Sequence, residues 1–391
     1  MASRGPGTRI GLIPAAGTRR WRFDSRPGDT AINTDLAFDT DDVNEMLEQF
    51  MKTSPQVPIQ VVSPGGGDYV CMYIDHGVGD AHLIIELYVA LSQAAKFGDF
   101  VPPVPGSMRT PLLSCFWNAT RSDPKGMWSD AVDLVKSAVS RKGSGNPVVQ
   151  IADVGEAPPP DTGIGSARAV FVKSRVGYVD ELRAYRASTK QTATVTTYLI
   201  RSIYHAFREA GIEVSDDIFV MMDLRRHLPK GQWSLANLSA PVVVSVTPQM
   251  SAEDVTTAAF WQVASRKPLL RMMARSVVAR LRGLPAVEDV VKAQPGSARS
   301  TGPLTLSISD VTKIPASEKH ILKPGHKPED INLAIALQAP DPSYVNICMI
   351  TTPEDRAIHL TATFYDSRVD PDVVRAALTK ALETPASPRP E

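Results

Sequence analysis

The stretch DHGVGDA, residues 75–81, decides the predicted fold. It begins at the last residue of the apolar β-type segment Tyr69–Asp75 and ends at Ala81, where helical periodicity starts. The stretch is therefore predicted to form a tight turn between a strand and a helix. Its two glycines let backbone or a ligand come close to the imidazole of His76. A histidine with its ordinary pKa of about 6.5 can accept a proton at neutral pH when it is neutral and accessible. His76 is therefore our candidate general base.

The spacing of His76 and Asp80 is a weak pattern when it is taken alone. A hydrogen-bonded histidine that only stabilises the turn explains His76 equally well. Asp80 stands where a helix N-cap is expected, because the helical pattern begins at the next residue. Both structural explanations stay open at this level.

The elements next to the turn are clear in the sequence. Pro58–Val62 and Tyr69–Asp75 are predicted strands, joined by a turn with three consecutive glycines. The helix that starts at Ala81 has an apolar stripe at spacings of three and four residues, which predicts that it packs on a core. The stripe consists of Leu83, Leu87, Ala90, Leu91 and Ala94.

A lobe boundary is predicted in the middle of the chain. Residues 97–111 are rich in proline and lack periodicity, and Met127–Arg141 is a predicted helix. The many glycines and prolines of residues 141–168 are typical of a linker between lobes. We place the boundary near Pro160.

The N-terminal lobe, residues 1–160, then contains the turn, and the C-terminal lobe, residues 161–391, has strands and helices of its own. Its strands are predicted at Ala169–Lys173, 216–225, 241–246, 303–310, 331–338, 344–352 and 356–365. Its helices are predicted at Thr189–Ala210, at Ala252–Val290, and from the cap Asp370 to Leu382. The predicted fold class is α/β.

The composition is that of an ordinary folded protein, with 391 residues, of which 43% are hydrophobic and 21% charged. At about 150 residues per domain, two lobes with sizeable cores are expected. The 42 Lys and Arg residues balance the 42 Asp and Glu residues. No diffuse field therefore attracts nucleic acid or anionic lipid, although a local basic patch escapes this count. We expect no nucleic-acid partner.

Other residue patterns narrow the chemistry. Three cysteines lie far apart beside apolar residues, which indicates buried free thiols: Cys71, Cys115 and Cys348. His82 follows the turn, but no second cluster completes a metal site, so none is predicted. The motifs of serine hydrolases and P-loop enzymes are missing. Because no segment has the roughly 18 consecutive apolar residues of a membrane span, we expect a cytoplasmic protein.

At residues 75–81 the chain resembles the chloramphenicol acetyltransferase-like superfamily, the HxxxD acyltransferases. This superfamily includes condensation domains of nonribosomal peptide synthetases, wax ester synthases and polyketide-associated acyltransferases of mycobacteria. Its signature is His-His-x-x-x-Asp-Gly between a strand and a helix, and the second histidine and the aspartate match here. Asp75 replaces the first histidine and Ala81 replaces the final glycine.

Three further motifs extend the resemblance from about residue 55 to 385. Residues 221–229, MMDLRRHLP, are similar to the family's Val-Asp-Leu-Arg strand end. Residues 235–237, Leu-Ala-Asn, are similar to its Leu-Gly-Asn. Residues 309–315, SDVTKIP, stand where many members have Ser-Asn-x-Gly-x-Ile-Pro.

The resemblance implies a two-lobed α/β fold with an active-site tunnel between the lobes. His76 would take the proton of an acceptor hydroxyl or amine as it attacks a thioester, without a covalent acyl-enzyme. The thioester would be acyl-coenzyme A or an acyl-phosphopantetheine carrier protein, used as co-substrate, and no bound cofactor is expected. A small or lipid-like acceptor suits secondary-metabolite or lipid biosynthesis.

The resemblance also implies that Asp80 and Gly79 have a structural role in the turn. Asp80 would hold the turn through an arginine, for which Arg225 is our candidate. The alternative for Arg225 is a solvated surface charge.

Possible contacts to substrate complete the predicted site. Ser309 shares a strand face with two other hydroxyl residues and is a candidate donor to the oxyanion, although these residues are equally typical of a half-exposed strand. Asn237 is a second candidate contact. Asp75 would favour the protonated histidine if it points toward the ring, which raises the pKa of the histidine.

Two other functions stay open. The same fold could catalyse cyclisation, dehydration or epimerisation in natural-product biosynthesis, which Asp75 and the altered 309–315 motif would favour. A non-catalytic partner of a synthase is the third hypothesis, because only 75 residues precede His76.

Overall fold

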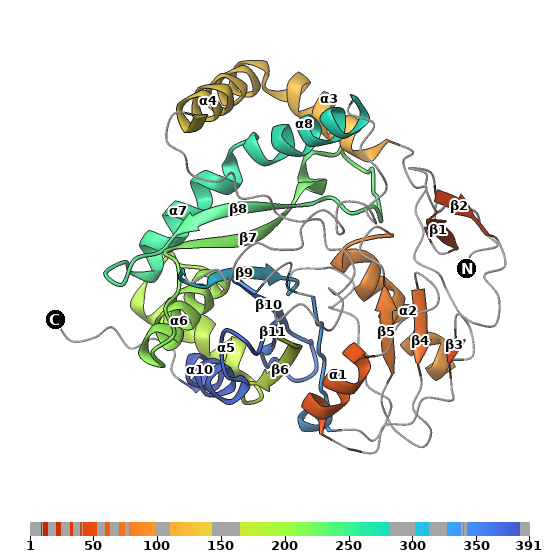
Figure 1. The fold of residues 1–391 in the computed structure, drawn as a ribbon, viewed down its shortest axis with the longest axis vertical. Helices are drawn as coiled ribbons and strands as arrows, with labels where there is room; N and C mark the ends of the chain where they lie inside the picture. Colours follow the sequence, from red (N-terminus) through yellow and green to blue (C-terminus); the bar gives the residue numbers. More distant parts are fainter. Residues whose placement is uncertain are drawn as a thin grey trace.

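The computed structural model describes most of the second half of the chain and shorter parts of the first half. The described residues are 9, 11–14, 21–24, 32–33, 40, 42–52, 59–62, 70–74, 78–97, 110–142, 165–281, 302–312, 327–337, 339 and 342–383. Within them, helices pack around a six-stranded sheet, next to which lie a three-stranded sheet and, at the right edge of the view, a two-stranded ribbon (Figure 1). The predicted α/β class is confirmed. In these ranges no helix is long and apolar enough to cross a membrane.

The six-stranded sheet has the order β6-β11-β10-β9-β7-β8 and contains both parallel and antiparallel pairs. Its strands are β6 (Ala167–Lys173), β7 (Asp217–Asp223), β8 (Ser239–Ser245), β9 (Thr305–Asp310), β10 (Tyr344–Ile350) and β11 (His359–Tyr365). All residues of β10 and β11 are buried, because both faces of the sheet are covered there. The strands predicted at these six places are confirmed.

Helices and the main core cover one face of this sheet. The helices of the C-terminal part are α5 (Tyr178–Thr189), α6 (Val195–Glu209), α7 (Ala252–Ala264), α8 (Lys267–Leu281) and α10 (Pro371–Glu383). α10 packs on α6 and β6, while α7 and α8 pack on β8. Alternate side chains of the central strands, among them Ile347 and Leu360, belong to this core.

The opposite face of the sheet contacts α2 (Ala81–Phe97), the helix that follows the turn. Ile85 and Val89 of α2 pack with Cys348 and Ile350 of β10. Another side of α2 packs on the small sheet and on Leu235, through Leu83 and Leu87, which contact Met72 and Ile74. The predicted helix is confirmed, and it is covered from two directions rather than along one stripe.

The small sheet has the order β3-β4-β5, and the two-stranded ribbon pairs β1 with β2. These strands are β1 (Leu12–Pro14), β2 (Trp21–Phe23), β3 (Ile32–Asn33), β4 (Ile59–Val62) and β5 (Cys71–Ile74). β4 and β5 are antiparallel. This arrangement is the one expected of two strands that the sequence predicts to be joined by a glycine-rich turn. β5 leads the chain toward the turn before α2.

The helix predicted at Thr189–Ala210 is wrong at its start. α5 ends at Thr189, and α6 begins only at Val195. Thr194 caps α6, because its side chain accepts from the N–H of Thr197 while the Thr197 hydroxyl accepts from the N–H of Thr194. The helix predicted at Ala252–Val290 is likewise divided, into α7 and α8, and its predicted residues 282–290 lie outside the described residues.

The strand predicted at residues 331–338 is also wrong, since residues 331–337 belong to no strand. This segment bonds to side chains of β11 instead of a neighbouring backbone. The N–H groups of Leu333 and Ile335 donate to His359 Nδ1 and Thr361 Oγ1, and Thr363 Oγ1 donates to the carbonyl of Leu337. The alternating pattern therefore arises from lying across a sheet face, not from pairing at its edge.

Three helices that precede residue 160 pack against the C-terminal part. They are α1 (Val43–Lys52), α3 (Pro111–Ser122) and α4 (Pro124–Lys142). α1 contacts β6, while α3 and α4 contact α8. The sequence predicted α4 but missed α1 and α3. The boundary near Pro160 and the linker lie largely outside the described residues, so the division into residues 1–160 and 161–391 stays a prediction.

The cysteines are free, as predicted. Cys115 and Cys348 are buried, whereas Cys71 is only partly buried. Burial raises the pKa of Cys115 to about 11 and that of Cys348 to about 12.

Candidate functional site

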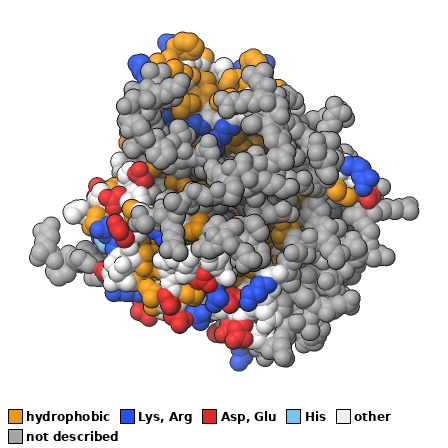
Figure 2. Space-filling model, in the orientation of Figure 1, with side chains coloured by type: hydrophobic (Ala, Val, Ile, Leu, Met, Phe, Trp, Pro, Cys, Tyr) orange, Lys and Arg blue, Asp and Glu red, His pale blue; other side chains and the backbone are white. Residues whose placement is uncertain are grey.

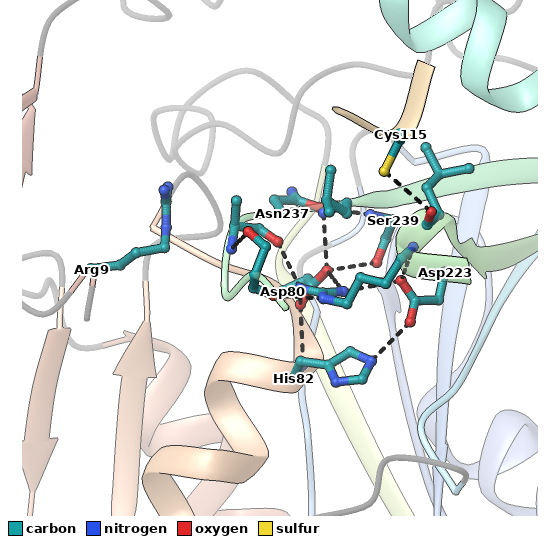
Figure 3. Close-up of polar contacts among 12 residues, drawn as sticks. Arg9, Asp80, His82, Cys115, Asp223, Asn237 and Ser239 are labelled. Atoms are coloured by element: carbon teal, nitrogen blue, oxygen red, sulfur yellow. Dashed lines mark hydrogen bonds and ion pairs between the residues drawn. The ribbon is translucent and has the colours of Figure 1, made fainter. Parts of the chain in front are cut away.

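The turn between β5 and α2 is the centre of the candidate site, and the structure describes its second half (Figure 3). Residues 75–77 lie outside the described residues, so the roles of Asp75 and His76 stay predictions. Residues 78–80 are buried. The Asp80 carbonyl accepts the N–H of Ile84 at 3.2 Å, which begins the hydrogen-bond ladder of α2.

Asp80 both caps α2 and binds Arg225. Its Oδ1 accepts the N–H of His82 at 3.1 Å, as an N-cap does. Both carboxylate oxygens accept from the guanidinium, Oδ1 from Nη2 at 2.9 Å and Oδ2 from Nη1 at 2.8 Å. Oδ2 also accepts from the Leu238 N–H and the Ser239 hydroxyl, each at 3.1 Å. The two roles considered for Asp80 are thus present together as contacts.

Arg225 is buried, so the alternative of a solvated surface charge is wrong. Besides its two bonds to Asp80, its Nε donates to the carbonyl of Ser234 and its Nη2 to that of Ala236, both at 2.7 Å. Its Nη1 donates to Asp223 at 3.1 Å. Burial by itself lowers the pKa of Arg225, but the two carboxylates outweigh burial and hold the pKa above its ordinary value.

This cluster connects parts of the chain that are distant in sequence. Asp80 begins α2, and Arg225 lies in the 3-10 helix η4 (Leu224–His227) at the end of β7. The other partners belong to residues 234–239, which lead into β8. A bidentate arginine fixes the position and the orientation of its carboxylate. The pair therefore fastens the second half of the turn to the large sheet.

Position 79 has no room for a side chain, so it requires glycine. A Cβ at this position would lie 2.7 Å from Cβ of Leu83 and 2.9 Å from the carbonyl oxygen of Leu235. The backbone of the turn and residue 235 approach each other so closely that even a methyl group would force them apart. The sequence predicted a close approach to the imidazole of His76, which lies outside the described residues, and the approach to residue 235 was not predicted.

The sequence missed a histidine of the same cluster. His82, in the first turn of α2, has its Nε2 3.1 Å from Oδ2 of Asp223. Its ring meets the indole of Trp233 edge-on, with centroids 5.1 Å apart, and Arg225 lies over the same indole. Burial raises the pKa of Asp223. The hydrogen bond with His82 and the charge of Arg225 lower it by more, so the pKa lies below its ordinary value.

The N-terminal part of the chain also contacts the turn. Arg9 donates from Nε to the carbonyl of Val78. Burial and the charge of Arg225 lower the pKa of Arg9, and the charge of Asp80 opposes them. A second arginine is therefore attached to the turn in addition to Arg225.

The remaining predicted residues lie in different surroundings. Asn237 is close to the cluster, and its Oδ1 accepts the N–H of Ser239 at 3.3 Å. Ser309 lies on β9, opposite Cys348 of β10, and is half-buried. Among the described residues, the contacts around Asp80 do not include Ser309. In the described part of the chain, no group of three His, Cys, Asp or Glu side chains could hold a metal ion.

Comparison by sequence finds neither a matching protein-family model nor a significantly similar curated protein. Comparison by structure finds several similar folds. A nonribosomal peptide synthetase, FmoA3, matches 97% of this chain with a TM-score of 0.55 and 16% identity, and this chain spans 37% of that one. The first condensation domain of the CDA synthetase matches 91% of this chain and 76% of its own, with a TM-score of 0.50 and 15% identity.

Polyketide synthase associated protein 5 from Mycobacterium tuberculosis matches 98% of this chain and 90% of its own, with a TM-score of 0.51 and 14% identity. These proteins share the condensation-domain fold with this chain, at sequence identities that show the fold alone. The fold implied by the sequence motifs is therefore confirmed, whereas the tunnel stays a prediction.

Proposed function

We propose that this protein transfers an acyl group from a coenzyme A or carrier-protein thioester to a hydroxyl or amine of a small or lipid-like acceptor. The observation that supports this most is the buried Asp80–Arg225 pair, which holds the end of the HxxxD motif against the large sheet. The fold shared with condensation domains and polyketide synthase associated protein 5 supports the same chemistry.

In this proposal His76 is the general base. It accepts the proton of the acceptor while the acceptor oxygen or nitrogen attacks the thioester carbonyl. The new C–O or C–N bond forms as the C–S bond breaks, and the proton then passes to the departing thiolate. No acyl-enzyme forms, and the co-substrates meet His76 in a tunnel between the lobes.

The other candidate residues support this step. Asp80, Gly79 and Arg225 position the turn and touch no reacting atom. Ser309 donates to the oxyanion and Asn237 contacts substrate. These roles agree with the buried cluster around Asp80 and with the half-buried face of β9.

The test is thiol release from a panel of acyl-coenzyme A donors with mixed alcohol and amine acceptors. Release that depends on the acceptor should fall by about 100 to 10,000-fold in His76→Ala, the usual contribution of a general base. His82→Gln is the matched control, because it changes the next histidine along the chain after His76. This variant should lose much less of the thiol release. The signal must be corrected for the three cysteines of the chain.

Unchanged release in His76→Ala would contradict the proposal. If neither protein releases thiol, an acylated carrier protein is the next donor. A reaction that needs His76 but leaves the acyl content of the substrate unchanged would instead indicate cyclisation, dehydration or epimerisation.

A further inference from the structure

The helices at the top of Figure 1 expose large apolar side chains. α3, α4 and α8 contact one another, and α3 also contacts η4, whose Arg226 donates to the carbonyls of Val263 and Ser265 at the end of α7. Figure 2 shows hydrophobic side chains gathered at the top of the molecule, where Figure 1 places α3, α4 and α8. The exposed residues are Leu113, Trp117, Trp128, Val135, Phe260, Trp261, Val277 and Val278. We call this surface the α3/α4/α8 face.

The helical spacing shows that this exposure is organised. In α3, Leu113 and Trp117 are four residues apart and share one side, while Cys115 and Ala119 on the other side are buried. In α4, Trp128 and Val135 are seven residues apart and face outward. α3 therefore has apolar residues on a buried and on an exposed side, and α4 has Met127 buried and an exposed apolar pair.

Tryptophan is concentrated on this face. Trp117, Trp128 and Trp261 are 53%, 74% and 68% exposed, and the chain has only five tryptophans. Water-exposed indoles are costly, since an indole has a large apolar ring and a single donor. The interface between water and lipid, in contrast, satisfies both parts of the ring, and tryptophan is enriched there.

The charge of the same segments is strongly positive, although the whole chain is neutral. Residues 111–142 and 266–281 contain ten Lys and Arg but only three acidic residues, and α7 adds two acids at its first turn, at the opposite end from Phe260 and Trp261. The three acids already have basic partners, since Asp123 and Asp130 bond to Arg266 and Asp133 to Lys267. Five further exposed bases lie on the same three helices: Arg121, Lys125, Lys136, Arg271 and Arg275. This is the local basic patch that a count over the whole chain cannot detect.

We propose that the α3/α4/α8 face binds an anionic lipid bilayer. Exposed tryptophans beside lysine and arginine on adjacent helices are the features of helices that lie in a membrane interface. The apolar side chains would enter the headgroup region, and the bases would attract anionic headgroups. Such binding would bring the protein to a bilayer as a source or destination of lipid-like molecules.

Vesicle flotation tests this inference with the full chain. Wild type should float with vesicles of phosphatidylcholine mixed with phosphatidylglycerol but not with phosphatidylcholine alone. Tryptophan emission should shift to shorter wavelength when the mixed vesicles are added. Arg271→Glu with Arg275→Glu should weaken binding by at least about fivefold for each base reversed.

Trp117→Ser with Trp128→Ser separates a lipid interface from a simple attraction between charges. This variant keeps every base and should still lose flotation and the emission shift. Val373→Ser with Arg375→Glu, two exposed positions on α10, is the matched control and should float like wild type. The thermal transition of each variant shows whether it is folded.

Three results would overturn the inference. They are flotation that is independent of phosphatidylglycerol, absence of flotation with both vesicles, and flotation that survives the tryptophan substitutions in folded protein. Binding of an oligonucleotide that the arginine variant loses, without binding to vesicles, would assign the patch to a different polyanion.

Discussion

Two buried aspartates, Asp80 at the start of α2 and Asp355 between β10 and β11, are charged groups that the fold has removed from water. Both side chains are almost fully buried. Asp80 faces the guanidinium of Arg225, which stays charged at any ordinary pH. Asp355 bonds to Nε2 of His359 at 2.8 Å and lies 3.2 Å from Nζ of Lys173.

The difference between the two sites lies in what their partners connect. Asp355 and His359 are four residues apart, and Lys173 belongs to β6, the strand next to β11, so the Asp355 cluster stays within the large sheet and one of its loops. Asp80 and Arg225 are 145 residues apart, and their pair joins the candidate catalytic turn to the large sheet. The Asp355 cluster therefore stabilises one sheet and its loop, whereas the Asp80–Arg225 pair determines where the candidate turn lies relative to that sheet.

Removing Arg225 should produce the largest effect. Arg225→Ala leaves Asp80 buried without its cation and should lower the free energy of unfolding by about 3–5 kcal/mol, measured by urea denaturation. Arg226→Ala, the next residue along the chain, is the matched control, because the exposed Arg226 bonds to the carbonyls of Val263 and Ser265 and its loss leaves no buried carboxylate without a cation. Equal losses in the two variants would contradict the special role of the Asp80 site.

A substitution at Gly79 should have the next largest effect. Gly79→Ala inserts a methyl group against Leu83 and the Leu235 carbonyl, so it should cost about 1–3 kcal/mol of stability. Gly126→Ala is the comparison, because a Cβ there would meet side-chain atoms of Asp123 and Arg266 and no backbone atom among its three nearest neighbours. Thermal unfolding of both variants measures the difference, and a neutral Gly79→Ala would refute the close approach.

The Asp355 site should depend on pH in acid. Burial raises the pKa of Asp355, but its hydrogen bonds, above all that with His359, lower it to about 2. Because the unfolded pKa is about 3.9, the ionised Asp355 stabilises the protein fully above about pH 4, and this contribution disappears as the pH falls toward 2. The difference in stability between wild type and Asp355→Asn should therefore shrink over that range. A difference that is constant from pH 6 to 2 would disprove this assignment.

The sequence predicted the parts of the fold that depend on local patterns. The strands on both sides of the glycine-rich turn, the helix from Ala81 and the six strands of the large sheet all have clear periodicity. The helix start at Val195 was missed because Thr194 and Thr189 are equally good caps in sequence. α3 was missed because the proline-rich residues before it obscured its beginning.

The site was harder to predict because it depends on long-range pairing. The family motif suggested Arg225 as the partner of Asp80, but burial of that arginine could not be read from its neighbours. The pairing of His82 with Asp223 follows once Asp80 and Arg225 meet, since His82 lies two residues after Asp80 and Asp223 two residues before Arg225. That regularity was a signal in the sequence, but it has meaning only after the two segments are known to be adjacent.

The most direct measurement of the central claim is the mass of the acceptor after incubation with the protein and an acyl thioester. Acyl transfer predicts a product heavier than the acceptor by one acyl group, formed by wild type and reduced by about 100 to 10,000-fold in His76→Ala. A protein that stays unmodified while the product accumulates would agree with direct transfer. An acylated product formed equally by His76→Ala, or an acyl group found on the protein instead of the acceptor, would contradict it.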